Sequence, residues 1–135
     1  MVVRLSTWIV DISGWEPDPI EWTATLAQFS PEIQAKIRSY HHHIDAQRSL
    51  VGKLLVHTIV CRTYSVPWDS IKIQTRSDGK PYLDTPLPPG CRFQFNLSHD
   101  GSMVVCCFSE ENWGPLTTQA TTQKISVSPG IQATR

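Results

Sequence analysis

The sequence lacks an excess of either charge and any long apolar run. Its 135 residues include 12 Lys and Arg side chains and 12 Asp and Glu side chains, so the formal net charge is zero. A broad basic surface for nucleic acid or anionic membrane is therefore not expected. No apolar stretch approaches the ~18 residues of a membrane-spanning helix, and Asp11 interrupts the N-terminal apolar segment where a signal peptide would still be apolar. We expect a cytoplasmic protein that binds neither nucleic acid nor membrane.

The sequence also lacks any pair of cysteines at metal-binding or redox spacing. Its four cysteines are Cys61, Cys91, Cys106 and Cys107, and none forms a CxxC pair. Neighbours in a strand point to opposite faces, so Cys106 and Cys107 cannot act together there. This pattern favours free thiols in a reducing compartment, with a disulfide framework or a zinc site as the alternatives.

Acidic residues are missing from the C-terminal segment, where no Asp or Glu follows Glu111. Residues 113–135 are rich in Thr, Gln, Ser and Ala and show little apolar periodicity. Such a segment buries too little apolar surface to order itself. We therefore expect one folded unit over residues 1–112 and a divergent, disordered tail over residues 113–135.

The N-terminal half of the chain predicts one strand and then helices. Residues 2–11 alternate as in a half-buried strand, with Val3, Leu5, Thr7 and Ile9 on one face. A short helix is expected over residues 20–29, and Ser30-Pro31-Glu32 is a typical helix start. A long helix begins near Asp45, with an apolar stripe formed by Val51, Leu54, Leu55 and Ile59. Gly52 inside this helix suggests close approach by another backbone or a ligand, with a simply tolerated glycine as the alternative.

The second half predicts hairpins. Strands over residues 71–75 and 80–83 are separated by a turn at residues 77–79, and residues 92–98 place Phe93, Phe95 and Leu97 on one face. The apolar run 103–108 follows Asp100-Gly101, and an Asp-Gly turn between two strands is a strong hairpin signal. The expected fold class is α/β of the α+β type, with an antiparallel sheet packed against a long helix.

Three segments resemble the Sfp-like 4′-phosphopantetheinyl transferases. Residues 45–57, DAQRSLVGKLLVH, are similar to a family helix that reads roughly DAxxxLxGRLLLR. Residues 79–83, GKPYL, are similar to the family turn GKPxL, and residues 95–101, FNLSHDG, match FNxSHxG at every fixed position. The resemblance covers roughly residues 5–112 and implies the N-terminal half of a fold built from two similar halves.

The resemblance implies a transferase that moves phosphopantetheine from coenzyme A to a serine of an acyl, peptidyl or aminoacyl carrier protein. The family includes enzymes that activate aminoadipate reductases of lysine biosynthesis, fatty acid synthases and polyketide synthases. Coenzyme A is the implied substrate, and Mg²⁺ is the metal of the family. The implied coenzyme-binding residues are Gly79, Lys80, Pro81, Ser98, His99, Lys53 and Arg48. Strand-end donors and positive charge suit phosphate oxygens.

The sequence departs from the family after the third segment. The family continues to a metal-binding GxD motif and later a KExxxK motif, whereas this sequence has Pro115-Leu116 after Trp113-Gly114. No catalytic residue and no metal ligand is identified, so we expect a truncated chain that is inactive alone. The abrupt change suggests a frame change or alternative splice. Alternatives are a half-domain that binds coenzyme A or a carrier protein without catalysis, and a protein that pairs with a second half or another copy.

The run His41-His42-His43 suggests a metal site at first sight. Consecutive residues point in different directions around a helix, so the three cannot all reach one ion. We do not expect a metal there.

Overall fold

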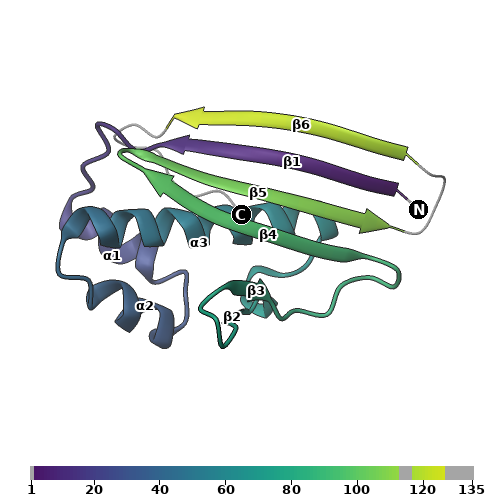
Figure 1. The fold of residues 1–135 in the computed structure, drawn as a ribbon. Coiled ribbons are helices and arrows are strands. Elements are labelled where there is room, and N and C mark those ends of the chain that lie inside the picture. The colour runs from purple at the N-terminus through teal and green to yellow at the C-terminus, as the bar shows by residue number, and fades with distance from the viewer. Residues whose placement is uncertain (1, 113–116, 127–135) are drawn as a thin grey trace.

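The computed structural model describes residues 2–112 and 117–126, with side chains over residues 3–112 (Figure 1). Its helices are α1 (Pro19–Leu26), α2 (Pro31–Arg38), α3 (His43–Tyr64) and the 3₁₀ turn η1 (Trp68–Ser70). Its strands are β1 (Val2–Asp11), β2 (Ile73–Thr75), β3 (Pro81–Leu83), β4 (Arg92–Asp100), β5 (Met103–Asn112) and β6 (Thr117–Ser126). The expected α+β class, with an antiparallel sheet packed against a long helix, is confirmed.

The larger sheet has the strand order β4-β5-β1-β6, and β2 and β3 form a separate hairpin. β5 lies between β4 and β1 and is antiparallel to both, while β6 is parallel to β1. In this register Met103 pairs with both Asp100 and Asp11. The tip of the β4–β5 hairpin therefore lies beside the end of β1 (Figure 1).

The core lies between α3 and the face of the sheet that it covers. Val51, Leu55 and Ile59 of the predicted stripe are buried and Leu54 is partly buried, while Phe93 and Phe95 are buried on β4 as predicted. Val104, Cys106 and Phe108 of β5 join the same cluster. Each fully buried side chain of this size stabilises the fold by about 1.5–3 kcal/mol. α3 thus gives the hairpin a rigid support.

The β4–β5 hairpin is confirmed, with its two-residue loop one position later than Asp100-Gly101. Asp100 still pairs in the ladder, and Gly101 and Ser102 form the loop. Gly101 has φ +56°, as a type II′ turn requires at its first central residue. The turn at residues 77–79 is also present, since Gly79 has φ +89° and its N–H donates to the carbonyl of Arg76 at 2.9 Å.

The predicted helix start at Ser30 is confirmed, because Ser30 caps α2 and Pro31 is its first residue. The Oγ of Ser30 accepts a hydrogen bond from the backbone N–H of Ile33 at 3.4 Å. α1 is shorter than residues 20–29 and ends at Leu26. Phe29 lies beyond its end and is buried in the core. α3 begins at His43, two residues before Asp45.

The predicted face of β1 was wrong. The core lies on the side of Ser6 and Val10, which are buried, and of Trp8, which packs against the cluster. Leu5, on the other face, is 48% exposed. The strand is apolar on both faces, so alternation could not decide between them. The ring of Trp8, packed edge-on against Phe108 with centroids 6.3 Å apart, is on the covered face.

The structure differs from the expected disorder over part of the segment 113–135. Residues 117–126 form β6, paired in parallel with β1 from Val2–Thr117 to Asp11–Ser126. β-Branched threonine favours strands even where apolar residues are few, and β1 otherwise presents an unpaired edge. The rest of the predicted tail lies outside the described residues.

The four cysteines lie within the described residues, and none of them is joined to another by a disulfide. Cys106 is buried and Cys107 is exposed, as the opposite faces of a strand predict. Burial raises the pKa of the Cys106 thiol to about 12, which leaves that thiol protonated and unreactive. Among the described helices, none is long and apolar enough to cross a membrane.

Candidate functional site

A cavity of about 180 Å³ lies between the N-terminal half of α3 and the β4–β5 hairpin. It brings together four of the predicted coenzyme-binding residues, Arg48, Lys53, Ser98 and His99, which come from two of the three motifs. The other lining residues are Tyr40, Asp45, Ser49, Gly52, Leu97 and Val104. The helix motif and the hairpin motif therefore meet at one place.

Helix geometry explains why α3 contributes so many polar groups to this cavity. Asp45, Ser49 and Lys53 follow one another at four-residue spacing and so lie on one face of the helix. Arg48 and Gly52 belong to the same face at the adjacent spacing. The motif thus presents one polar stripe, while the apolar stripe of α3 faces the sheet.

The surroundings of Lys53 disfavour the charged form of its side chain. Its side chain is partly buried, and desolvation, with a further effect from the nearby charge of Lys36, lowers the pKa of its ammonium group. Lys36 belongs to α2, which packs against α3. An anion in the cavity would relieve both effects. Of the charged side chains that line the cavity, Arg48 and Lys53 are basic and Asp45 is acidic, which leaves an excess of one positive charge.

Ser98 and His99 are exposed residues near the end of β4, close to the hairpin tip. By the alternation of a strand, His99 lies on the face that carries Phe95 and Leu97, toward α3. Ser98 lies on the opposite face with Asn96. Both nevertheless line the cavity at the end of the strand, where the sheet stops. The imidazole of His99 is thus available there to a phosphate, and Ser98 borders the same cavity.

Gly52 allows α3 and β4 to pack closely. A Cβ atom at this position would lie 3.4 Å from Cδ1 of Leu97, at the limit of ordinary contact. Gly52 also lines the cavity floor. The close approach at Gly52 is therefore made by a side chain of the hairpin motif, where the sequence suggested a backbone or a ligand.

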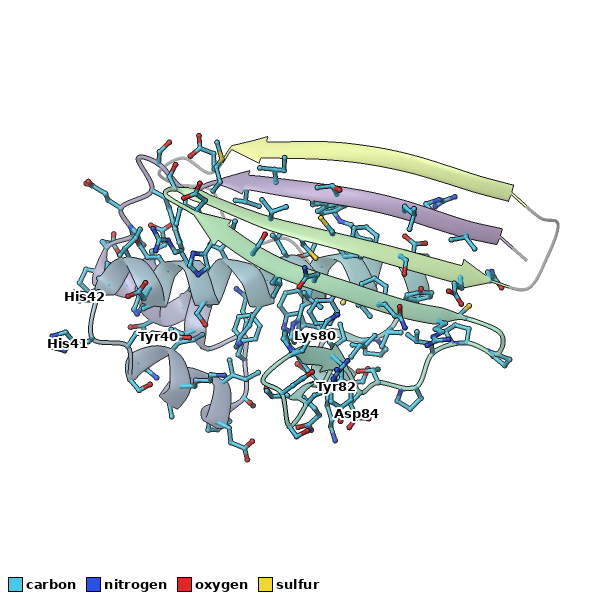
Figure 2. All side chains as sticks on the ribbon, viewed as in Figure 1. Tyr40, His41, His42, Lys80, Tyr82 and Asp84 are labelled. Carbon is cyan, nitrogen blue, oxygen red and sulfur yellow. The ribbon has the colours of Figure 1, made fainter. Side chains whose placement is uncertain are left out.

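Lys80 does not line this cavity. It lies on the β2–β3 hairpin and lines a separate, more open cavity of about 420 Å³ together with Thr7, Asn96 and Cys107. Figure 2 shows Lys80 near Tyr82, away from Tyr40 at the end of α2. Gly79 and Pro81 hold the turn on either side of Lys80, and the carboxylate of Asp78 accepts a hydrogen bond from its backbone N–H at 3.1 Å. The three motifs do not converge on one cavity in this structure.

Another cavity, of about 650 Å³, contains none of the predicted site residues. It lies between the α1–α2 connection and β2, and Phe29, His57, Trp68 and Lys72 are among its lining residues. Its three rings pack on one another, with centroids 5.0 to 5.9 Å apart. Since they are almost fully buried, the rings act as core rather than as an open aromatic surface.

The residues described by the structure contain no group of three His, Cys, Asp or Glu side chains placed to hold a metal ion. His41 and His42 are exposed, and the ring of His43 packs against Trp22 with centroids 5.0 Å apart. The described part of the chain thus does not fit the Mg²⁺ site of the family. We assign no step of a reaction to a metal held by these residues.

Sequence reasoning missed three contributors to the site. Tyr40 and Ser49 line the cavity, and the charge of Lys36 acts on Lys53. Ser49 could have been found from its four-residue spacing to Lys53. Lys36 and Tyr40 lie before α3, and only the packing of α2 on α3 brings them close.

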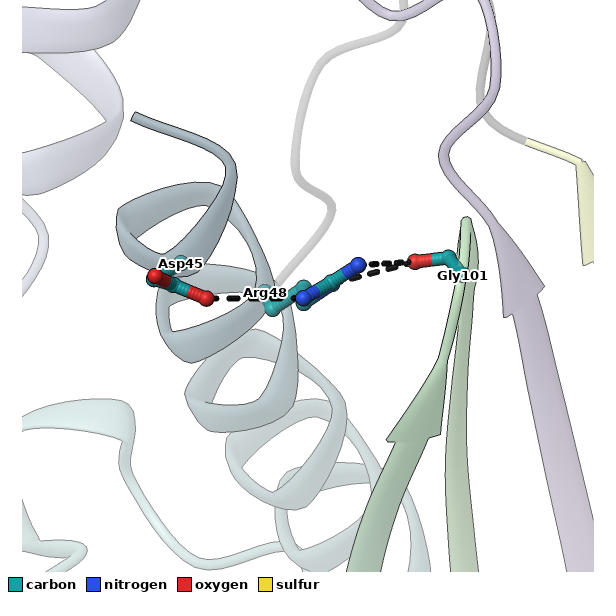
Figure 3. A network of polar contacts seen from close by, with 3 residues as sticks. All are labelled: Asp45, Arg48 and Gly101. Atoms are coloured by element: carbon teal, nitrogen blue, oxygen red, sulfur yellow. Dashed lines mark hydrogen bonds and ion pairs between the residues drawn. The ribbon is translucent and has the colours of Figure 1, made fainter. Parts of the chain in front are cut away.

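Arg48 has partners of its own in the cavity. Its guanidinium donates two hydrogen bonds to the carbonyl oxygen of Gly101, from Nε at 3.0 Å and from Nη2 at 2.6 Å (Figure 3). Its Nη1 lies 3.4 Å from Oδ1 of Asp45. Two nitrogens of the Arg48 guanidinium are therefore already hydrogen-bonded to the hairpin tip.

The sequence of this chain is similar to those of known proteins from one family. Residues 13–111 match the family model described as 4′-phosphopantetheinyl transferase, N-terminal. The L-aminoadipate-semialdehyde dehydrogenase-phosphopantetheinyl transferase of Rattus norvegicus is 35% identical over 106 residues, which cover 77% of this chain and 34% of the relative. The 4′-phosphopantetheinyl transferase Sfp of Bacillus subtilis is 36% identical over 89 residues, covering 66% of this chain and 38% of that relative.

A third relative matches a similar share of the chain. The 4′-phosphopantetheinyl transferase pptA of Paxillus involutus is 38% identical over 85 residues, which cover 62% of this chain and 31% of the relative. The chain thus spans about a third of the length of the curated relatives that it matches.

Proposed function

The chain belongs to the 4′-phosphopantetheinyl transferase family, whose N-terminal domain it carries, and from this premise we propose that it binds the phosphate groups of coenzyme A between α3 and the β4–β5 hairpin. The observation that carries the proposal is the cavity in which Lys53, Ser98 and His99 meet. Lys53 comes from the helix motif and Ser98 and His99 come from the hairpin motif, so the cavity joins a cation to an imidazole at the strand end where Ser98 lies. A phosphate ester accepts hydrogen bonds from both of these groups.

The size of the cavity limits what it holds. A volume of about 180 Å³ suits one phosphate and its neighbouring atoms rather than the whole coenzyme. We therefore assign it to one anionic group of the ligand, with the remainder extending along the surface. Lys80, with Gly79 and Pro81 on either side, is proposed as a second contact, reached from the separate cavity beside Asn96.

The reaction served by this half-domain is proposed to be transfer of phosphopantetheine from coenzyme A to a serine of a carrier protein. The serine hydroxyl attacks the β-phosphate, and adenosine 3′,5′-bisphosphate leaves. Such a transfer needs neutralisation of the charge that develops on the phosphates. Because the described residues supply no acidic metal site and no carboxylate side chain follows Glu111, we propose that the 135-residue chain binds without transferring.

Titration calorimetry with coenzyme A, in the presence and absence of Mg²⁺, tests this proposal. We expect binding that Mg²⁺ does not change, and a loss of about tenfold in affinity for Lys53→Gln, since one charge-assisted contact is removed. Lys72→Gln removes the same charge at an exposed lysine that lines another cavity, and should bind as the wild type does.

Two outcomes would contradict the proposal. Absence of heat with coenzyme A would remove the binding function, and equal losses in Lys53→Gln and Lys72→Gln would mean that only net charge matters. Mass spectrometry of a carrier protein incubated with the chain, coenzyme A and Mg²⁺ addresses transfer. A phosphopantetheine adduct would show that the chain is active by itself.

A further inference from the structure

We propose that Arg48 is a positioning residue that fixes the tip of the β4–β5 hairpin on α3 and so places Ser98 and His99 at the cavity. The inference rests on the proposed function for its ligand. Its geometric part stands on the contacts of Arg48 alone.

The contact made by Arg48 is well suited to this role. Both Nε and Nη2 donate to one carbonyl oxygen, that of Gly101, at 3.0 and 2.6 Å. The third arm of the guanidinium faces Asp45, one turn earlier on α3, at 3.4 Å. The Arg48 side chain is 20% exposed, which limits competition from water. A planar guanidinium held by two partners, the carbonyl of Gly101 and the carboxylate of Asp45, has little freedom to turn toward a ligand (Figure 3).

The carbonyl that Arg48 binds belongs to the hairpin loop. Gly101 is the first loop residue, so its carbonyl takes no part in the ladder between β4 and β5. The carbonyl of the next residue, Ser102, accepts a hydrogen bond from the backbone N–H of Ile12 at 2.9 Å. The tip is thus anchored on one side by α3 and on the other by the segment after β1.

This anchoring acts directly on the site residues. Ser98 and His99 of β4 lie three and two positions before Gly101, and all three residues are exposed. Without Arg48, Ser102 would still be held by Ile12, but the α3 side of the tip would lose its contact. The tip could then move relative to Lys53, which is fixed on α3. Affinity for an anion would fall although Arg48 does not touch it.

The test measures affinity for coenzyme A and for dephospho-coenzyme A in Arg48→Gln and Arg48→Lys. We expect a loss of about tenfold in Arg48→Gln, by the same factor for both ligands because no phosphate contact is removed. Arg48→Lys keeps the charge but cannot reproduce the fork, so it should restore little of the affinity. Arg62→Gln, an exposed arginine in the last turn of α3, is the control and should bind like the wild type.

NMR of the free protein supplies a readout that does not depend on the ligand. In both Arg48 variants we expect the amide resonances of residues 98–102 to shift and their hydrogen exchange to accelerate, while those of Arg62→Gln stay unchanged. Thermal unfolding first establishes that each variant is folded. If Arg48→Gln does not fold, Arg48→Lys alone is compared with the wild type.

The outcomes distinguish a positioning role of Arg48 from direct contact between Arg48 and the ligand. Unchanged tip resonances, with affinity lost in Arg48→Gln and retained in Arg48→Lys, would mean that Arg48 contacts the ligand as a charge and would overturn the inference. A loss for coenzyme A alone would assign Arg48 to the 3′-phosphate and also overturn it. If the wild type binds neither ligand, the proposed function fails, and the tip resonances still decide whether Arg48 holds the hairpin.

Discussion

His57 is a buried histidine whose surroundings hold it neutral. It is 3% exposed, and its ring packs against Phe29 and Trp68 with centroids 5.0 Å from each. Its Nδ1 lies 2.9 Å from the carbonyl oxygen of Lys53. Desolvation lowers the pKa of His57 to about 4, the hydrogen bond to the Lys53 carbonyl opposes this shift, and the charge of Lys53 adds to it.

This burial predicts how stability depends on pH. The unfolded chain takes up a proton near pH 6.5 and the folded chain only near pH 4, so the unfolded state binds more protons between these values. The contribution of His57 to stability is therefore present above pH 6.5 and is lost as the pH falls to 4. The loss is on the order of 3 kcal/mol.

Urea unfolding at pH 4.5 and pH 7 checks this prediction. His57→Phe keeps a ring between Phe29 and Trp68 and removes the titration, so its unfolding free energy should change less between the two pH values than that of the wild type. His41→Gln alters an exposed histidine and should keep the wild-type difference. Equal pH dependence in His57→Phe and the wild type would refute the assignment.

The roles of single residues were only partly predictable from the sequence. Lys53 and His99 were singled out by motif, and the cavity places them together. Arg48 was singled out for a phosphate, but its fork binds the carbonyl of Gly101. A bond between residues separated by 53 positions depends on how the hairpin lies across α3. The sequence pattern contains no information on that angle.

At the scale of elements, the hairpin between β4 and β5 is the piece that local chemistry determines most fully. Strict alternation before the turn and an apolar run after it predict the hairpin, and Gly101 occupies the first position of its two-residue loop, one position later than an Asp-Gly loop would place it. Gly101 adopts φ +56°, where a side chain is strained, and a Cβ atom there would meet nothing within 4 Å. A side chain at position 101 would therefore destabilise the protein through backbone strain and not through a steric clash.

Gly101→Ala should therefore destabilise the protein by about 1–2 kcal/mol, the cost of the left-handed region for an ordinary residue. The midpoint of urea unfolding measures the change. Ser102→Ala, in the same turn but with ordinary backbone angles, should lie within about 0.5 kcal/mol of the wild type. A Gly101→Ala protein as stable as Ser102→Ala would show that the turn relaxes without cost.

β1 shows where element-level reasoning fails. Its two faces carry similar numbers of apolar residues, so periodicity fixed the strand but not the side that α3 covers. The low apolar content of residues 117–126 likewise led to a prediction of disorder. These residues form a strand, because threonine favours strands without being strongly hydrophobic. In both cases the deciding interaction is with a distant element, α3 for the first and the edge of β1 for the second.

At the scale of the whole molecule, the sheet is covered on one face. Figure 1 shows α3 on one side, and among the described elements none covers the opposite face. That face carries Leu5, 48% exposed, and the partly exposed Ile9 and Val105. One half of a fold built from two similar halves would leave such a face open, and the chain spans about a third of the length of its relatives.

The central claim is that an anionic group binds where α3 meets the hairpin tip. Titration of the ¹⁵N-labelled chain with coenzyme A, followed by amide chemical shifts, tests it most directly. The account predicts that the largest shifts fall on Lys53, Ser98 and His99 and saturate together. Shifts confined to the cavity beside Phe29 and Trp68, or no shifts at all, would contradict it.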